Sequence, residues 1–107
     1  MARRSLEILR LGRMLHDPTR LLILTFLYHV AALDYVSLRK KLKFSTGNLS
    51  WQLRKLERAG YLAIEKRFKG RRPQTICGMT KKGREALEMY AEMLKEIRKG
   101  TEGAKED

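Results

Sequence analysis

The sequence predicts a small, mostly helical domain with one β-hairpin, which places it in the α+β class. Apolar residues recur at three- and four-residue spacings along most of the chain, and they alternate at two-residue spacing only within residues 61–79. A length of 107 residues fits one domain and leaves no room for a second. The hydrophobic fraction of 43% suffices for one compact core. We therefore expect a single domain over residues 1–100.

Two helices are expected at the start of the chain. Residues 5–15 spread their apolar side chains widely around a helix, so apolar surface should remain after one side has packed. Asp17 and Pro18 are typical of an N-cap followed by a first-turn proline. The apolar run over residues 21–27 that follows has the length and pattern of a buried helix, and we expect it to be the central core helix, ending within residues 31–34.

A pair of helices joined by a tight turn is expected over residues 37–60. Tyr35 and Val36 are predicted to form a short extended piece, after which Ser37 can cap a short helix that ends at about Lys43. This arrangement is the helix-turn-helix pattern, and its second helix has the clearest signal in the chain.

The second helix of the pair is predicted to run from about residue 45 to residue 59. Ser45 or Thr46 can cap its start, and Gly60 suits the position beyond its C-cap. Leucines spaced four and three residues apart define its core side: Leu49, Leu53 and Leu56. Gly47 and Trp51 then face away from the core.

Residues 61–79 are predicted to form a hairpin with a basic tip. Leu62 and Ile64 alternate with other residues, residues 69–73 supply turn chemistry, and residues 75–79 return as a strand. Thr80 can cap a final long helix over residues 80–99. We expect this helix to end at Gly100, followed by a disordered tail over residues 101–107.

The two terminal helices, residues 5–15 and 80–99, carry more apolar surface than one small core needs. We expect them to pair in a homodimer, the alternative being that both helices pack within one monomer. The residues predicted to form the dimer interface are Leu6, Leu9, Leu87, Tyr90, Leu94 and Ile97. A two-fold dimer would place the two copies of the helix over residues 45–59 about 34 Å apart.

The charge balance indicates a polyanionic partner. Lys and Arg number 24 against 12 Asp and Glu, which gives a net charge of +12. Nucleic acid is the leading candidate. No membrane association is expected, because the longest apolar run is far too short to span a bilayer. The single cysteine, Cys77, and the lack of a secretion signal favour a reducing, cytoplasmic location.

The helix over residues 45–59 offers side chains suited to the major groove of double-stranded DNA. Its N-terminal half is the expected reader of base edges, since Asn and Gln pair best with adenine. The candidates in that half are Ser45, Thr46, Asn48, Ser50, Trp51 and Gln52. Its C-terminal half is better placed for phosphates, through Arg54, Lys55 and Arg58. For Trp51, the alternative is that it covers the hairpin base or a neighbouring helix.

The hairpin tip is a second candidate contact, because an arginine at such a tip can enter a narrow minor groove. The alternative is a set of ordinary solvated surface charges. The candidates are Lys66, Arg67, Lys69, Arg71 and Arg72.

From about residue 15 to residue 97 the sequence resembles the winged helix-turn-helix DNA-binding regulators allied to the ArsR and MarR repressors of archaea and bacteria. The matching segments are residues 16–20 (HDPTR) with 23–24 (IL), 47–53 (GNLSWQL), 55–57 (KLE), 59–61 (AGY), 70–75 (GRRPQT) and 79–83 (MTKKG). The resemblance implies a sequence-specific transcriptional regulator that binds double-stranded DNA as a homodimer, with paired terminal helices and the hairpin as its wing. At the position of Trp51 such proteins more often carry a small or basic residue.

Other functions find less support in the sequence. Metal sensing, known among ArsR relatives, needs thiolate and imidazole ligands, whereas Cys77 is alone and His16 and His29 have no ligand spacing. We expect no metal and no cofactor. No catalytic grouping is suggested, so an enzyme is not expected. The alternative from a different class is a winged-helix protein-interaction module that docks an acidic protein partner. Charge alone leaves RNA open, although the aromatic-bearing sheet of single-strand readers is missing.

Overall fold

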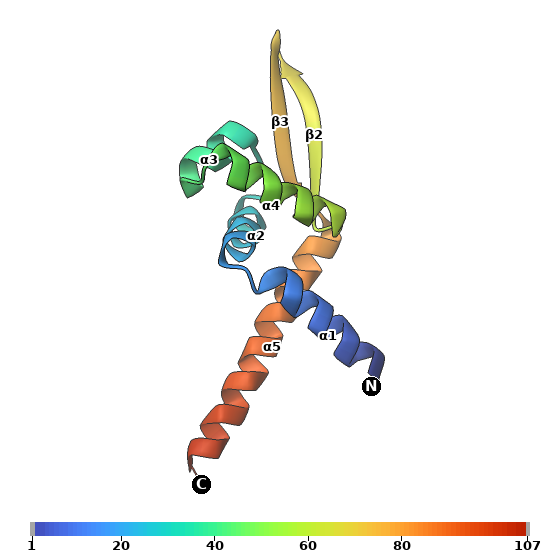
Figure 1. The fold of residues 1–107 in the computed structure, drawn as a ribbon, viewed down its shortest axis with the longest axis vertical. Helices are drawn as coiled ribbons and strands as arrows, with labels where there is room; N and C mark the ends of the chain where they lie inside the picture. The colour runs from blue at the N-terminus through green and yellow to red at the C-terminus, as the bar shows by residue number, and fades with distance from the viewer. Residues whose placement is uncertain (1, 107) are drawn as a thin grey trace.

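The computed structural model describes residues 2–106 and contains five helices and three strands within them. This composition confirms the predicted α+β class (Figure 1). In chain order the elements are α1 (Ala2–Leu15), α2 (Pro18–Val30), β1 (Ala32–Asp34), α3 (Tyr35–Leu42), α4 (Thr46–Arg58), β2 (Leu62–Lys69), β3 (Arg72–Met79) and α5 (Lys81–Glu106).

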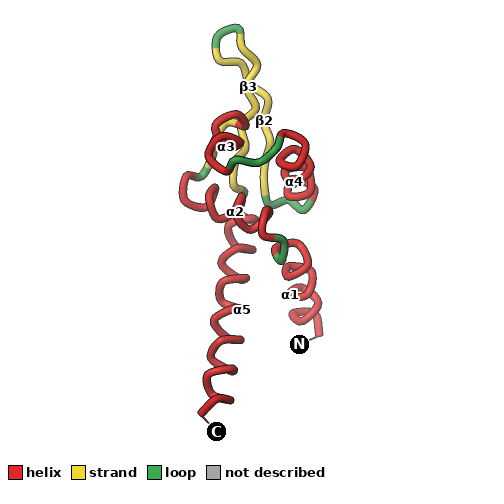
Figure 2. Tube along the Cα trace, turned by 60° about the vertical axis from the view of Figure 1, so that its left-hand side comes forward, coloured by secondary structure: helices red, strands yellow, loops and turns green. Residues whose placement is uncertain are grey.

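The molecule is elongated, with extents of 64 × 28 × 22 Å. The β2–β3 hairpin, hereafter the wing, projects from one end, and the C-terminal part of α5 projects from the other (Figure 1). Helices α2, α3 and α4 lie between them, and α1 lies on the α5 side (Figure 2). The basic hairpin and the terminal helices are therefore separated along the long axis.

The core lies where α2 meets α4 and the base of the sheet. Ile23, Leu24 and Leu27 of α2 are completely buried, as the apolar run predicted. The three predicted core leucines of α4 are also buried: Leu49, Leu53 and Leu56. Helix α2 therefore packs against the apolar side of α4, and the opposite side of α4 faces outward.

Local capping sets most of the helix boundaries as predicted. The Asp17 carboxylate accepts hydrogen bonds from the backbone N–H groups of Thr19 (2.9 Å) and Arg20 (3.1 Å), with Pro18 at the first helical position of α2. The Thr80 hydroxyl oxygen accepts from the Gly83 N–H at 3.0 Å and starts α5. Gly60 has a φ of +83°, which lets the chain leave α4 sharply and enter β2.

The sheet has three antiparallel strands in the order β1-β3-β2. The wing pairs Leu62 with Met79 at its base and Lys69 with Arg72 at its tip, so only residues 70 and 71 form the turn. Gly70 supplies the positive φ of +66° that a two-residue turn favours. The sequence predicted the hairpin but missed β1, because a three-residue strand has too little alternation to stand out.

The start of α3 differs from the prediction. The extended piece is β1, not Tyr35 and Val36, and α3 begins at Tyr35, so the helix-turn-helix starts two residues before Ser37. Asp34 is the N-cap: its carboxylate accepts from the Ser37 N–H at 3.0 Å. Hydrogen bonding from Ser37 also holds the pKa of Asp34 below its ordinary value. An earlier capping side chain therefore takes the role that Ser37 was expected to have.

The predicted end of the last helix at Gly100 is wrong. Helix α5 continues through Gly100 to Glu106, while Asp107 lies outside the described residues. Within the described range, Gly60 and Gly70 are the glycines with positive φ, so Gly100 does not adopt the left-handed geometry of a C-cap. A helix-interior glycine costs only about 1 kcal/mol, and helical neighbours on both sides outweigh it here.

The terminal helices bury only part of the predicted dimer interface inside the monomer. Tyr90 is just 7% exposed and belongs to the core of the monomer, although it also lines a hollow between α1 and α5, and Leu87 packs half-buried against the same core. The other predicted interface residues are exposed: Leu6, Leu9, Leu94 and Ile97. Three of them, Leu9, Leu94 and Ile97, line the same hollow between α1 and α5. No helix in the described part of the chain is long and apolar enough to cross a membrane.

Candidate nucleic-acid interface

Helix α4 presents its first turn to solvent. The Ser45 hydroxyl caps it by accepting a hydrogen bond from the Asn48 N–H at 3.2 Å, and the Ser45, Thr46 and Asn48 side chains are exposed. From α3, the Tyr35 hydroxyl donates to the Thr46 carbonyl oxygen at 3.1 Å. Helix α3 thus fixes the turn of α4 that carries the predicted base-reading residues.

Ser50 is not fully available for an outside partner. Its hydroxyl oxygen lies 3.1 Å from the Tyr35 hydroxyl oxygen in a hydrogen bond, and the residue is half-buried. Ser50 therefore helps Tyr35 to hold α3 against α4.

Gln52 was predicted to read bases, and the structure contradicts this assignment. Gln52 is 6% exposed, and its side-chain oxygen accepts a hydrogen bond from Arg20 Nη1 at 3.0 Å. The physical reason is helical geometry: Gln52 lies three residues after Leu49 and four before Leu56, on the buried side of the helix. That spacing was present in the sequence and could have placed Gln52 correctly.

Arg20, which was not singled out as a site residue, links three helices beneath α4. Its Nε donates to the Met14 carbonyl oxygen at the end of α1 at 2.6 Å, and its Nη1 donates to Gln52 of α4. The same nitrogen lies 3.8 Å from the Asp17 carboxylate at the start of α2. A planar guanidinium with several fixed donors can join such partners at once. Arg20 therefore sets where α4 lies relative to α1 and α2.

The outward face of α4 carries one aromatic and several cationic side chains. Trp51 is 53% exposed, and the Lys55 ammonium lies 4.4 Å from the centroid of its ring in a cation–π contact. Arg54 and Arg58 are exposed as predicted, and Lys55 is half-buried. The face therefore combines hydrogen-bonding groups in its first turn with positive charge in its later turns.

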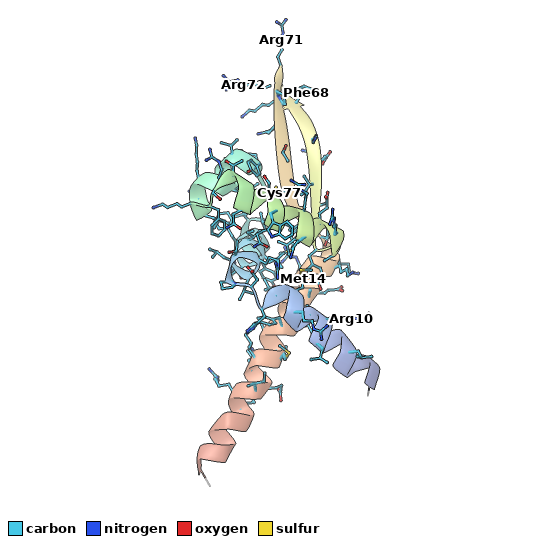
Figure 3. The ribbon with its side chains drawn as sticks, in the orientation of Figure 1. Arg10, Met14, Phe68, Arg71, Arg72 and Cys77 are labelled. Atoms are coloured by element: carbon cyan, nitrogen blue, oxygen red, sulfur yellow. The ribbon has the colours of Figure 1, made fainter. Side chains whose placement is uncertain are left out.

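The five basic residues predicted on the wing are all exposed: Lys66, Arg67, Lys69, Arg71 and Arg72. Arg71 lies at the outermost point of the molecule, with Arg72 just behind it (Figure 3). Within the described residues, Arg67 is the one wing cation in a salt bridge, at 2.8 Å from Glu65. The hydrogen bond from Arg67 lowers the pKa of Glu65, although both groups are fully solvated and the pair adds little stability.

A hollow of about 410 Å³ lies between α4 and the wing. Thr46, Ser50 and Arg54 of α4 line one side, and Ile64, Lys66 and Thr75 of the wing line the other. Cationic side chains thus border the hollow from both elements, and the two predicted contact regions belong to one continuous surface.

Phe68 is a feature of the wing that sequence reasoning missed. It is 75% exposed near the tip, beside the arginines (Figure 3). In the sequence, Phe68 looks like one more apolar residue of an alternating strand. Only the length of the hairpin in the structure shows that Phe68 lies beyond the core.

Cys77 and the histidines are not grouped. Cys77 is completely buried at the base of the wing, and burial raises the pKa of its thiol to about 11. His16 and His29 are exposed. Among residues 2–106, no three His, Cys, Asp or Glu side chains lie close enough together to hold a metal ion.

Comparisons with known proteins agree with this geometry. A family model described as a winged helix DNA-binding domain matches residues 19–98. An uncharacterized protein of Methanocaldococcus jannaschii is 31% identical over 90 residues, which cover 84% of this chain and 98% of that protein.

Solved structures show the same architecture. A transcriptional regulator homologue from Pyrococcus horikoshii OT3 superposes with a TM-score of 0.79 at 28% identity, over 92% of this chain and 97% of its own. The regulator MarR gives 0.67 at 21% identity, over 87% and 69% of the two chains. Reduced AbfR bound to DNA gives 0.58 at 18% identity, over 99% and 92%.

The last two likenesses concern the fold alone, and the family and fold are those of DNA-binding regulators rather than of enzymes. The family match extends from the first turn of α2 into α5 and includes the whole of α4 and the wing. The chain therefore belongs to the family of winged-helix DNA-binding domains.

Proposed function

We propose that this protein is a transcriptional regulator that binds specific sequences in double-stranded DNA as a homodimer. Helix α4 would enter the major groove, and the wing would follow the backbone and the adjacent minor groove. The observation that carries the proposal is the shared surface of α4 and the wing, in which Arg54 and Lys66 border one hollow from opposite sides. A duplex presents phosphates on both sides of each groove, so it fits a surface with two cationic borders.

The residues of α4 divide into three roles in this proposal. Thr46 and Asn48, exposed in the first turn, would contact base edges, because a recognition helix reads with its N-terminal residues. Arg54 and Arg58 would contact phosphates and set affinity. Ser50 and Gln52 would act indirectly, through their hydrogen bonds to Tyr35 and Arg20.

Trp51 would contact the walls of the major groove. Its exposed ring is apolar, and the Lys55 ammonium above it brings a positive charge to the same place. Thymine methyl groups and sugars suit such an apolar face, while the ammonium can approach a phosphate.

The homodimer is supported by the exposed apolar side chains of the terminal helices. Leu9 and Leu94 are 58% and 47% exposed and line the same hollow between α1 and α5. Pairing these helices about a two-fold axis would remove that apolar surface from water and present two α4 helices to one face of a duplex. The bound site would then be pseudo-palindromic.

A selection of bound sequences from a pool of random duplexes tests the proposal. We expect enrichment of one motif with two inverted half-sites about one helical turn apart. An Asn48→Ala variant should enrich a less defined motif at the positions its side chain contacts. A pool that shows no enrichment after several rounds would contradict sequence-specific binding and favour the protein-docking alternative.

A further inference from the structure

The tip of the wing carries an apolar pair among its basic residues. Phe68 and Pro73 are directly paired across the two strands, so their side chains lie on the same face of the hairpin. Phe68 is 75% exposed, more than any other exposed large hydrophobic side chain that the structure describes, and Pro73 is exposed beside it. Water therefore surrounds an aromatic ring whose burial against a partner would be favourable.

The face on which this pair lies is the face turned to α4. Leu62, Ile64, Lys66 and Phe68 alternate along β2 and so share one side. Leu62 is buried in the core, while Ile64 and Lys66 line the hollow beside α4. Phe68 is the next residue outward on that side, beyond the reach of α4. If a duplex binds with one groove on α4, the Phe68 ring lies at the next groove of that duplex.

The surroundings of the pair specify the kind of partner. Lys66 precedes the pair on the same face, Lys69 and Arg72 are adjacent to it in the strands but project from the opposite face, and Arg71 lies in the turn; within the described residues none of the four is in a salt bridge. A partner must therefore offer negative charge around an apolar surface. The DNA minor groove does so, with phosphates along both rims and sugars and stacked bases between them.

Resting on the proposed function, we infer that Phe68 and Pro73 form an apolar wedge that enters the minor groove, partly opens one base step and bends the duplex. Phenylalanine and proline are among the side chains that proteins insert in this way. Arg71 and Arg72 would hold the wing in the groove, and the wedge would favour flexible pyrimidine–purine steps there. The wing would thereby add sequence preference without a hydrogen bond to a base.

The test uses the full chain and the most enriched duplex from the random-sequence selection, labelled with a fluorescence donor and acceptor at its two ends. Binding of the wild-type protein should raise energy transfer, because a bend shortens the distance between the ends. Phe68→Ala should bind the duplex at least about fivefold more weakly and should leave it straight. Fivefold is the lower end of the effect of removing an aromatic contact to a base. The salt dependence of Phe68→Ala should stay that of the wild type, since no charge is removed.

Two further variants control for folding and for a general loss of apolar surface. Phe68→Leu should retain most of the bend, because leucine is also an effective wedge. Met89→Ala removes an exposed apolar side chain of α5, outside α4 and the wing, and should change neither the affinity nor the bend. The melting temperature of Phe68→Ala should match that of the wild type, because the ring has little packing to lose.

The outcomes separate the two proposals. If the wild-type protein binds its selected duplex but leaves it straight, or if Phe68→Ala bends it equally, the wedge is rejected while sequence-specific binding stands. If no duplex is enriched in the selection, the proposed function itself fails, and the wedge fails with it.

Discussion

Arg20 shows how a single residue prepares a binding face that it does not itself form. Its guanidinium donates to the end of α1 and to Gln52 of α4, and it lies beside the Asp17 carboxylate that caps α2. The side chain is largely buried, so these contacts are poorly screened by water. Gln52, which lies within the stretch predicted to read bases, thus helps to position the helix.

The difference between Gln52 and Asn48 can be measured. Gln52→Ala should lower the free energy of unfolding by about 1 to 3 kcal/mol, because it leaves a buried Arg20 donor without its acceptor. Gln52→Glu returns an acceptor to Arg20 and should recover stability. Asn48→Ala should change the free energy of unfolding by less than about 0.5 kcal/mol, since the side chain is exposed. Denaturant unfolding of the three variants provides the comparison, and equal losses for Gln52→Ala and Asn48→Ala would refute it.

Cys77 gives a pH dependence at the base of the wing. Burial raises the pKa of its thiol from 9.0 to about 11, so the folded state holds the proton more tightly than the unfolded state. The stability contribution is fully present below about pH 9 and is lost as the pH rises toward 11. Stability measured between pH 8 and 11 should fall for the wild type and fall less for Cys77→Ala. Parallel curves for the two proteins would show that the thiol does not contribute.

For single residues, local chemistry was predictable and tertiary contacts were not. Asp17, Ser45 and Thr80 cap their helices as expected, because a cap depends on backbone atoms two or three residues away. The spacing from Leu49 and Leu56 could have placed Gln52 on the buried side, but its hydrogen bond to Arg20, 32 residues away in the chain, could not be predicted. Phe68 was missed for a related reason: its exposure depends on how far the hairpin extends past α4.

Among the elements, the wing depends most on charge. Replacing both Arg71 and Arg72 with Ala should weaken binding to every duplex and reduce the slope of log affinity against log salt concentration by about 4, one for each phosphate contact that the two protomers of the dimer lose. Arg67→Ala provides the control, because its guanidinium is already engaged by Glu65 and it alternates with Phe68 onto the other face of β2. Fluorescence anisotropy titrations at several salt concentrations measure these slopes. A slope unchanged in the double variant would exclude the wing tip from the interface.

The type of each element other than β1 could be predicted from the spacing of its apolar residues. Several helix boundaries could not, because neighbouring residues offered competing caps or ends. Helix α4 and the hairpin matched their predictions because long periodic segments are hard to misread. The start of α3 moved because Asp34 caps it ahead of Ser37. The end of α5 moved because Gly100 keeps helical geometry, and a glycine alone does not dictate a C-cap.

For the whole molecule, the separation of the wing from the far end of α5 allows DNA contact and dimer contact to be tested apart. Leu94→Glu combined with Ile97→Glu should give monomers by light scattering and weaken binding to the selected duplex, because a charge in the seam cannot be buried. Met89→Glu places a single charge on α5, about 140° from Leu94 and about 80° from Ile97 around the helix, and should leave the molar mass unchanged. An unchanged mass in the double variant would reject the proposed seam.

In the proposed complex, two copies of α4 and of the neighbouring wing contact one duplex. Hydroxyl-radical footprinting on the selected duplex tests this arrangement, because the protected sugars report which grooves the protein covers. We expect two equivalent sets of protections related by a two-fold axis and separated by about one helical turn, with the minor-groove protections lost when Arg71 and Arg72 are replaced by Ala. A single uninterrupted protection, or a pattern that the wing variant leaves intact, would contradict it.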